Sequence, residues 1–567
     1  MPKKQSIILS VFLLFLAFVH ATAQNKKPFS ESLKVKDYSA IINKIDSVVK
    51  KKMAQYHIPG VSIALVDDQS VVWAKGFGYT DQSKTSQVNE ETLFSAQSIS
   101  KTYTATAFLM EVKKGKYNLD DQLIKYYPSF TVHSRYGDNE ERKITFRDLL
   151  SHRAGFCHEA PIGSNYDTVH CTFEEHIKSI GDSWLRFPVG KFYSYSNTGP
   201  DLIGYVLSWD AGIPIEEYLK QNLLTPLGMK NSTYNQEEAY KSGNVAKGYV
   251  GNTEIEKTFI GDVAGGGLYS NATEMAKFLS FQFNNCKING KTVISPGLLT
   301  QMHSVQFKLD GQVAGYGLGV MLKPYHGGTL VYHIGGGYGY RAVQAWIPEA
   351  KVGVIILTNN DDAYSSANEI YDEALQGMIK AKFGSLSQTN VPAVNKPVVQ
   401  LSHTYLKKLI GTYKGDGNIL KIVAVNNKLA AVSGTDTAFL SAHSKAEFFS
   451  SNGDRFIFSF NKMGMPAYFI NLNKSDADFY IFNDSPNEKP GPNKPSYNAL
   501  TGSYKGYNDR QEDIIKLYMK NGYLYCSAGG ATKVTEYIPG VFFTTDGESV
   551  IEKGNMLYLG NKTYTKQ

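Results

Sequence analysis

The chain has few cysteines and no pattern of metal ligands. Four cysteines in 567 residues are too few for a disulfide framework. Cys157 and Cys171 flank one loop and could pair in an oxidising compartment, whereas Cys286 and Cys526 have no evident partners. No cysteine has metal-ligand spacing, and no His-Glu-x-x-His run occurs. We therefore expect neither a metal site nor a cofactor.

A strong net charge is also lacking, as is any long apolar run after the first residues. The formal charge of +7 includes Lys3 and Lys4, which lie in a segment that we expect to be removed. The longest basic cluster, residues 50–52, lies in a helix-like stretch and is typical of a solvated face. We expect no nucleic-acid partner.

Residues 1–23 have the pattern of a signal peptide. Lys3 and Lys4 precede an apolar run from Ile7 to Val19, and Ala21-Thr22-Ala23 precedes Gln24 as an A-x-A cleavage signal. The apolar run is shorter than the ~20 residues that a membrane-spanning helix needs. An uncleaved anchor is the alternative. Cleavage predicts a periplasmic or secreted protein with no stable membrane insertion.

Residues 37–384 are predicted to form one mixed domain of strands and helices. Helical patterns cover 40–56, 98–114 and 366–380. Strand-like runs cover 61–66, 71–77, 316–322, 330–334, 342–347 and 352–357. Because strands occur at both ends of the domain with helices between them, we expect the two ends to pair in space.

Residues 385–397 are polar with two prolines, as in a linker, and 398–567 have an all-β pattern. This region repeats itself, since Leu409-Ile-Gly-Thr-Tyr-Lys-Gly415 recurs as Leu500-Thr-Gly-Ser-Tyr-Lys-Gly506. Each half has too few evident strands to be stable alone, which favours two halves that close one small barrel. Two independent β modules are the alternative.

A Ser-x-x-Lys pattern occurs at Ser47, Ser98 and Ser459, and only Ser98 stands at the start of an apolar helix. Residues i and i+3 share a helix face, so Lys101 Nζ can approach Ser98 Oγ. A lysine that deprotonates serine must be neutral part of the time, which requires burial or cationic neighbours. A helix cap with a solvated lysine is the alternative.

Tyr-x-Asn occurs at Tyr195-Ser196-Asn197 and at Tyr269-Ser270-Asn271. The first follows a Pro-Val-Gly loop and precedes a helical run, whereas the second has the pattern of a helix cap. A tyrosine beside a cation can accept and return a proton in acyl transfer. Simple packing of Tyr195 is the alternative.

His-x-Gly occurs at His326, where the flanking residues favour a simple turn between two strand-like runs, and at His333. His333 ends a strand-like run and precedes Gly335, Gly336 and Gly337, where a substrate backbone can approach closely. A lone histidine usually has a structural role, so a catalytic role for His333 is expected only if the Ser98 and Tyr195 motifs also belong to an active site.

The order Ser98-x-x-Lys101, Tyr195-x-Asn197, His333-x-Gly335 resembles the serine β-lactamase-like superfamily, which includes class C β-lactamases, DD-carboxypeptidases, D-aminopeptidases and related esterases. The segments that begin at Ile58, Ile144, Pro226 and Ala264 also resemble that family, and the resemblance covers about residues 40–380. It implies an α+β fold, an antiparallel sheet flanked by helices with an all-helical region. The tail more weakly resembles the lipocalin-like barrel of some peptidases in this superfamily.

The resemblance implies roles for single residues. Ser98 would attack a carbonyl, Lys101 and Tyr195 would share the base and proton-return roles, and His333 would assist from its strand. Asn197 would orient substrate and Lys101, and the N–H groups of Ser98 and Gly336 would form an oxyanion hole. In addition, Arg341 is a candidate clamp for a substrate carboxylate, although an ordinary surface arginine is the alternative.

At His333 this chain differs from the class C β-lactamases, and this difference narrows the range of expected activities. Class C β-lactamases usually carry lysine where this chain has His333, and histidine is a weaker, pH-dependent cation. The form with histidine looks more like the DD-peptidases, D-aminopeptidases and esterases. The resemblance thus implies an exported D-stereospecific peptidase or amidase, of the DD-carboxypeptidase or D-aminopeptidase type, that works through an acyl-enzyme on small peptide, amide or ester substrates. A carboxylesterase or weak β-lactamase with the same residues is one alternative. A protein that binds a small ligand in the barrel is another.

Overall fold

The structure is a computed structural model that describes residues 36–567 with gaps at 165–169, 256–260, 389–395, 416–417, 427, 474–476, 487–488 and 509–510, and also Phe29 and Leu33. The predicted signal peptide, residues 1–23, lies outside the described residues, as does most of the predicted linker.

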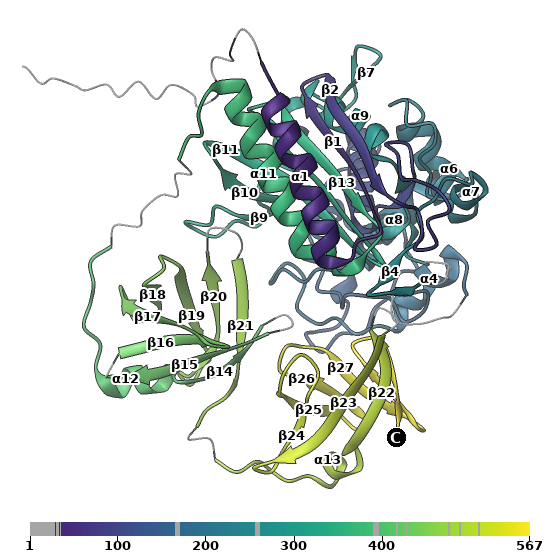
Figure 1. The fold of residues 1–567 in the computed structure, drawn as a ribbon. Coiled ribbons are helices and arrows are strands. Elements are labelled where there is room, and N and C mark those ends of the chain that lie inside the picture. The colour runs from purple at the N-terminus through teal and green to yellow at the C-terminus, as the bar shows by residue number, and fades with distance from the viewer. Residues whose placement is uncertain are drawn as a thin grey trace, which may run out of the picture.

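A seven-stranded antiparallel sheet forms the centre of the first domain (Figure 1). Its strands, in spatial order, are β2 (Ser70–Gly78), β1 (Gly60–Asp67), β13 (Val352–Thr358), β12 (Tyr340–Ile347), β11 (Gly328–Gly337), β10 (Met321–Tyr325) and β9 (Gly315–Tyr316). β1 pairs with β13, with Leu65 opposite Val354. The expectation that the two ends of the domain pair in space is therefore confirmed.

The prediction of a single strand over 316–322 is wrong. The segment is divided into β9 and β10, and the chain turns between them at Gly319, whose φ is 72°. A Cβ on Gly319 would lie 2.4 Å from Ala105 Cβ. Close contact with α2 (Ser100–Lys113), the helix that follows Ser98, thus requires glycine here and ends the strand.

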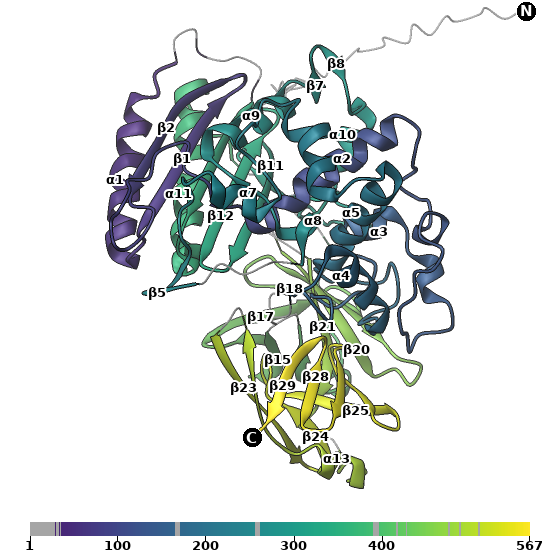
Figure 2. The same ribbon diagram turned by 90° about the vertical axis from the view of Figure 1, so that its right-hand side faces the viewer.

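Helices cover both faces of the sheet (Figure 2). The terminal helices α1 (Ser39–Tyr56) and α11 (Tyr364–Phe383) pack on one face in a shared apolar core. On the other face lie α2 and α9 (Ala272–Phe283), and the helical region continues that core. The further helices are α3 (Phe146–Leu150), α4 (Phe173–Ser179), α5 (Thr198–Ala211), α6 (Ile215–Leu219), α7 (Gln236–Lys241), α8 (Val263–Gly266) and α10 (Pro296–Met302).

Short strand pairs and caps complete the domain. The pairs are β3 (Phe94–Ser95) with β6 (Tyr269–Ser270), β4 (Tyr249–Val250) with β5 (Thr253–Glu254), and β7 (Lys287–Ile288) with β8 (Lys291–Thr292). Asn271 accepts a hydrogen bond from Glu274 N at the start of α9. This confirms that the second Tyr-x-Asn is a helix cap.

The C-terminal region forms two closed eight-stranded barrels, so the prediction of one barrel built from two halves is wrong. Barrel 1 contains β14 (Gly411–Lys414), β15 (Ile419–Val425), β16 (Lys428–Ser433), β17 (Asp436–Ala442), β18 (Glu447–Ser450), β19 (Arg455–Phe460), β20 (Pro466–Leu472) and β21 (Ala477–Asp484). Barrel 2 contains β22 (Gly502–Asn508), β23 (Gln511–Lys520), β24 (Tyr523–Cys526), β25 (Thr532–Ile538), β26 (Val541–Thr544), β27 (Ser549–Lys553), β28 (Met556–Leu559) and β29 (Lys562–Lys566). Several of these strands are only four or five residues long, too short to stand out as periodic runs, so the sequence pattern underestimated their number.

Each barrel begins with a short helix, α12 (His403–Leu409) or α13 (Pro495–Ala499). In both, a tyrosine of the repeated segment donates a hydrogen bond to a carbonyl four residues earlier, Tyr413 to Leu409 O and Tyr504 to Leu500 O, each at 2.8 Å. The interiors are filled by apolar and aromatic side chains. The repeat is thus one structural unit used twice.

Both barrels contact the helical region. Phe192 stacks on Phe479 of barrel 1 at 4.7 Å, and Trp184 packs edge-on against Phe543 of barrel 2 at 5.5 Å. Arg186 Nε lies 3.1 Å from Glu548 Oε1 and donates to Asp546 O at 2.8 Å. Barrel 2 is therefore held by a buried arginine as well as by aromatic packing.

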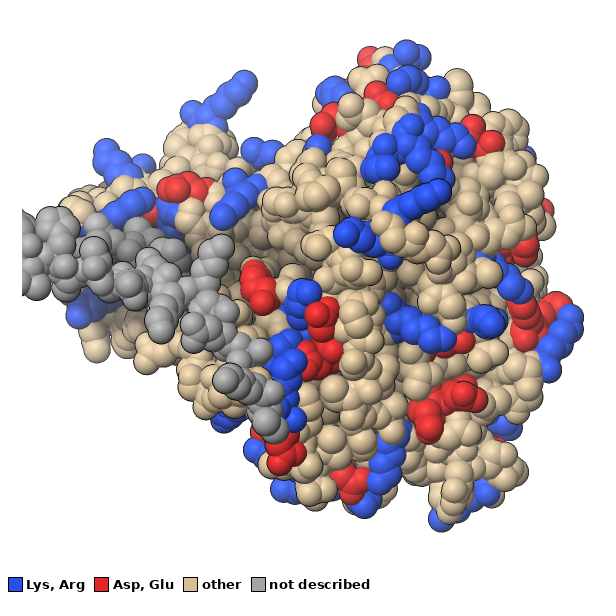
Figure 3. Space-filling view, turned by 90° about the horizontal axis from the view of Figure 1, so that it is seen from above, with Lys and Arg blue, Asp and Glu red and all other residues tan. Residues whose placement is uncertain are grey.

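Within the described residues, no helix is both long and apolar enough to cross a membrane, and no three His, Cys, Asp or Glu side chains cluster as metal ligands. No disulfide joins Cys157 to Cys171; the Cys157 thiol instead donates to Trp184 O at 3.4 Å. Figure 3 shows acidic and basic side chains interspersed over one face of the molecule.

Candidate active site

Ser98 lies in a single 3-10 turn, Gln97–Ile99, directly before α2. The helix predicted from residue 98 therefore starts with a tighter turn. Gln97 has a φ of 49°, in the left-handed region that non-glycine residues rarely adopt, and its side chain donates to Ser95 Oγ at 2.8 Å. This backbone turn leaves the Ser98 side chain partly exposed next to fully buried neighbours.

Lys101 is one turn further on and its ammonium group is completely enclosed. Its Nζ donates to Ser98 Oγ at 3.1 Å, to Asn197 Oδ1 at 2.6 Å and to Gly265 O at 2.8 Å. The side chain is 1% exposed. The structure thus brings together Ser98, Lys101 and Asn197, which lie far apart in the sequence.

The charge of Lys101 differs from the sequence expectation. Burial lowers the pKa of Lys101, but Tyr195 and the acidic Asp262 and Asp201 outweigh that effect, and the net pKa is raised. The sequence predicted that burial or cationic neighbours make this lysine neutral part of the time. Its neighbours are acidic instead, so Lys101 is a cation beside Ser98 at neutral pH.

Tyr195 lies on the loop before α5, between Lys101 and a histidine. Its ring centroid is 5.1 Å from Lys101 Nζ, and its hydroxyl takes part in a hydrogen bond with Lys101. The His152 ring packs against it at 4.4 Å. The Tyr195 side chain is half-buried, in contrast to the fully enclosed Lys101.

His333 points from β11 toward the same cluster but is not a cation. Burial, helped by Lys101, lowers the pKa of His333 to about 3. Because the Ile334 carbonyl 2.9 Å away only accepts, Nδ1 donates to it, and Nε2 accepts from Tyr316 OH at 2.8 Å. The expectation of a pH-dependent cation at His333 is therefore wrong for the neutral range.

His152 is a second buried histidine that sequence reasoning did not assign. Burial, together with Lys101 and His333, holds the pKa of His152 well below its usual value. Its Nδ1 accepts from Ser196 N at 3.2 Å, and its ring packs against Tyr316 at 4.5 Å. The segment from Ile144 to Gly155 resembles the family, but nothing in it showed that His152 supports Tyr195. Tyr316 had no sequence signal.

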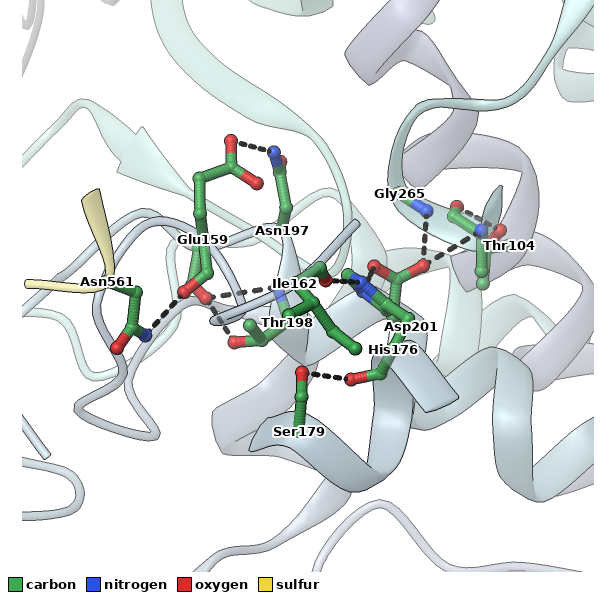
Figure 4. A network of polar contacts seen from close by, with 12 residues as sticks. Thr104, Glu159, Ile162, His176, Ser179, Asn197, Thr198, Asp201, Gly265 and Asn561 are labelled. Carbon is green, nitrogen blue, oxygen red and sulfur yellow. Dashed lines mark hydrogen bonds and ion pairs between the residues drawn. The ribbon is translucent and has the colours of Figure 1, made fainter. Parts of the chain in front are cut away.

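The buried carboxylates of Glu159 and Asp201 belong to a network of polar contacts near Asn197 and Gly265 (Figure 4). Asp201 accepts hydrogen bonds from Gly265 N at 3.1 Å and Ala264 N at 2.9 Å, and lies 3.1 Å from His176 Nε2. Gly265 O in turn accepts from Lys101. Burial and the neighbouring Asp201 raise the pKa of Asp262 well above its usual value, while the nearby Lys101 acts in the opposite direction. The network holds Lys101 in place through the Gly265 backbone.

The glycine run on β11 lies beside the turn that carries Ser98. A Cβ on Gly335 would lie 2.0 Å from Ala96 O, so only glycine allows this approach. Gly336 pairs with Arg341 on β12. Arg341 Nε binds Asp361 Oδ1 at 2.9 Å, and its guanidinium lies 5.5 Å from the Tyr364 ring. One face of Arg341 is thus occupied, and its role as a carboxylate clamp stays a prediction.

A cavity of ≈500 Å³ extends from Tyr195 to barrel 2. From the first domain it is lined by Tyr195, Glu159 and Arg186, and from barrel 2 by Asn561 and Tyr564, among others. A cavity of this size suits a small organic ligand or a short peptide.

Comparison with known proteins assigns this arrangement to a family. The Beta-lactamase family model matches residues 45–377, more than half of the chain. The protein therefore belongs to the Beta-lactamase family. It is a Beta-lactamase-family hydrolase by that assignment, with two closed barrels at its C-terminal side.

Individual relatives are distant. Beta-lactamase-like protein 2 of Dictyostelium discoideum is 24% identical over 77% of this chain and 83% of that protein. Protein flp of Staphylococcus aureus strain MW2 is 25% identical over 56% of this chain and 63% of its own length, and the unguisins hydrolase ungD' of Aspergillus campestris is 28% identical over 56% and 61%.

Two solved structures share the fold. The octameric penicillin-binding protein homologue from Pyrococcus abyssi has a TM-score of 0.53 at 25% identity and covers 77% of this chain and 99% of its own. SurE, solved with D-Leu, has a TM-score of 0.54 at 18% identity and covers 78% and 100%. The β-lactamase/transpeptidase-like fold expected from the sequence is thereby confirmed.

Proposed function

We propose that this chain is an exported serine hydrolase that forms an acyl-enzyme on Ser98 and acts on D-amino-acid peptides or amides. The observation that carries the proposal is the position of Lys101 Nζ, 3.1 Å from Ser98 Oγ and also bound to Asn197 and Gly265. The choice of substrate class is supported by SurE, which shares the fold and was solved with D-Leu, and by the Aspergillus relative, which is named as a hydrolase.

The charge state of Lys101 assigns the roles. Because Lys101 is a cation, it cannot take the Ser98 proton. The base is instead the phenolate form of Tyr195, which has released its proton to solvent before the substrate binds and whose negative charge the adjacent Lys101 offsets. Ser98 Oγ loses its proton to Tyr195 as it bonds to the substrate carbonyl carbon, and the Ser98 and Gly336 N–H groups stabilise the oxyanion. Tyr195 then returns the proton to the leaving amine as the C–N bond breaks. A water molecule then gives a proton to Tyr195 as its oxygen bonds to the acyl carbon. The ester bond to Ser98 Oγ breaks, Oγ takes the proton back from Tyr195, and the acid is released.

The role of His333 is structural and does not depend on a positive charge. Neutral and hydrogen-bonded on both ring nitrogens, His333 orders Tyr316 and the end of β11 next to the glycine run. A neutral group here supplies no charge to a substrate carboxylate. This favours peptides and amides over efficient β-lactam hydrolysis, which is consistent with the departure seen in the sequence.

The test is intact-protein mass spectrometry after incubation with a penicillin, followed by assays on paired D- and L-amino-acid amides and on short-chain esters. We expect Ser98→Ala to lose the adduct and all turnover, and D-amides to be preferred over L-amides. Ser47→Ala is a matched control, because Ser47 also begins a Ser-x-x-Lys pattern but lies on α1 and donates to Asn43 O.

Two results would change the proposal. Turnover that survives Ser98→Ala contradicts the assignment of the nucleophile. Turnover of esters alone, still dependent on Ser98, replaces the peptidase by a carboxylesterase. Export is tested separately, since cleavage after Ala23 predicts a mature protein that begins at Gln24.

A further inference from the structure

A buried carboxylate lies directly behind the Asn197 side chain. Glu159 is 2% exposed, and its Oε1 accepts from Asn197 Nδ2 at 2.7 Å (Figure 4). An asparagine amide has one accepting and one donating end, and only the accepting end can bind an ammonium group. Because Glu159 takes the donating end, Asn197 Oδ1 must face Lys101, where it lies 2.6 Å from Nζ.

The loop that carries Glu159 has no helix or strand of its own. Residues 151–164 are irregular, and their position depends on contacts with other segments. One of these is the hydrogen bond from Asn197 N to His158 O at 2.8 Å. Another comes from barrel 2.

The barrel contact is made by the turn between β28 and β29, residues 559–562. Asn561 Nδ2 donates to Glu159 O at 2.8 Å and to Ser183 Oγ at 3.0 Å. The φ of Asn561 is 91°, so the turn presents this side chain from a backbone conformation that asparagine tolerates and most residues do not. Asn561 thus joins the Glu159 backbone to a second segment of the first domain.

We propose that Glu159 is a positioning residue for Lys101, acting through the Asn197 amide, and that docking of barrel 2 through Asn561 holds Glu159 in place. Barrel 2 is then part of the catalytic apparatus and not an appendage. Glu159, Tyr195 and Asn561 also line one cavity, so the turn that positions Glu159 borders the space next to Tyr195. The inference rests on the proposed function of Ser98 and Lys101.

The first test exchanges the two partners. Asn197→Asp places a second carboxylate 2.7 Å from that of Glu159, and Glu159→Gln leaves two amides with no defined orientation. We expect each single variant to lower kcat by about tenfold to a hundredfold with little change in KM. The double variant restores one amide and one carboxylate, so its kcat should exceed that of Asn197→Asp alone by about tenfold.

A double variant whose loss in kcat is the product of the two single losses overturns the proposal, because a merely structural role gives no such recovery. Thermal unfolding of each variant identifies those that fail to fold. If Glu159→Gln is folded and as active as the wild type, the positioning role is wrong while the Ser98 mechanism stands. If the wild type shows no Ser98-dependent turnover, the proposed function itself has failed.

The second test addresses barrel 2 alone. Asn561→Asp keeps the size and the backbone preference of the side chain but removes the N–H donor to Glu159 O. We expect a fall in kcat of about tenfold with barrel 2 still folded. Asn521→Asp is the matched control, since Asn521 also has a positive φ, 50°, but lies in the β23–β24 turn of the same barrel. Equal kcat values for the two variants overturn the link between barrel docking and catalysis.

Discussion

At the scale of single residues, burial and neighbouring charges decide which groups around Ser98 carry a proton. Lys101, His152 and His333 are all buried in one cluster, yet their pKa values move in opposite directions. Acidic neighbours keep the lysine charged, and the charged lysine helps to keep both histidines neutral. Of these three groups, only Lys101 is therefore charged at neutral pH, and it lies beside Ser98.

This distribution predicts a pH-dependent stability at His333. The unfolded chain binds a proton at this histidine below pH 6.5, whereas the folded chain does so only near pH 3. Stability from this group is therefore present above pH 6.5 and falls as the pH drops through that window, by about 1.4 kcal/mol per pH unit. Calorimetry of His333→Gln should show a shallower loss of melting temperature between pH 7 and 4 than the wild type shows.

The exposed His403 on α12 supplies the control, because His403→Gln should leave the slope unchanged. Identical slopes for the wild type and His333→Gln would show that His333 is protonated in the folded protein at neutral or mildly acidic pH.

At the scale of secondary-structure elements, the two barrels reuse one local arrangement. Tyr413 and Tyr504 are fully buried, and each donates its hydroxyl hydrogen to a carbonyl at the end of the preceding helical turn. This contact fixes the angle between the short helix and the first strand of each barrel. The same seven-residue segment thereby starts both barrels.

The repeated contact predicts effects in the same direction at the two sites, with the larger effect at Tyr504, whose hydroxyl also lies 3.3 Å from Glu552 Oε1. Tyr413→Phe and Tyr504→Phe each leave the carbonyl of Leu409 or Leu500 without this donor. We expect each change to lower the free energy of unfolding of its own barrel by about 1–3 kcal/mol. Denaturant unfolding monitored by hydrogen exchange in each barrel would measure this. Tyr507→Phe, at a residue that is 52% exposed, should lower the free energy of unfolding much less. A similar loss at Tyr507 would show that the buried hydrogen bond does not account for the effect of the other two substitutions.

At the scale of the whole molecule, barrel 2 is held against the helical region by a buried ionic contact. Arg186 is 3% exposed and lies between Asp546 and Glu548 of the β26–β27 turn. Trp184 and Phe543 pack next to it, and Asn561 binds Glu159 O. The interface thus includes both the buried Arg186 contact and the Asn561 contact to Glu159, which in turn binds Asn197 beside Lys101.

Loss of Arg186 should therefore loosen barrel 2. Arg186→Met leaves two carboxylates facing each other without their cation, at a cost of about 3 kcal/mol. We expect faster hydrogen exchange in β26, β27 and the loop of Glu159, together with a lower kcat. Arg142→Met, at an exposed arginine that pairs with its neighbour Glu141, is the control. Unchanged exchange in the Glu159 loop would show that the two parts are not coupled.

Much of the first domain was predictable because its elements are long and periodic. The helix over 40–56 and the strands over 61–66 and 71–77 agree with α1, β1 and β2 to within one or two residues. The barrels were less predictable, because several of their strands have only four or five residues, too few for a clear period of two. Their number, and hence their separation into two closed units, depends on pairing between strands.

The sequence by itself determined the family, the Ser98–Lys101 spacing on one helix face and the presence of a repeat, because these depend on residues that are near in the chain or on recognisable motifs. Only the tertiary structure decided the charges of Lys101 and His333, since a pKa depends on which buried groups lie within a few ångströms. It likewise decided the contacts of Glu159 with Asn197 and Asn561. Those three residues are brought together by packing alone, and no spacing along the chain encodes that contact.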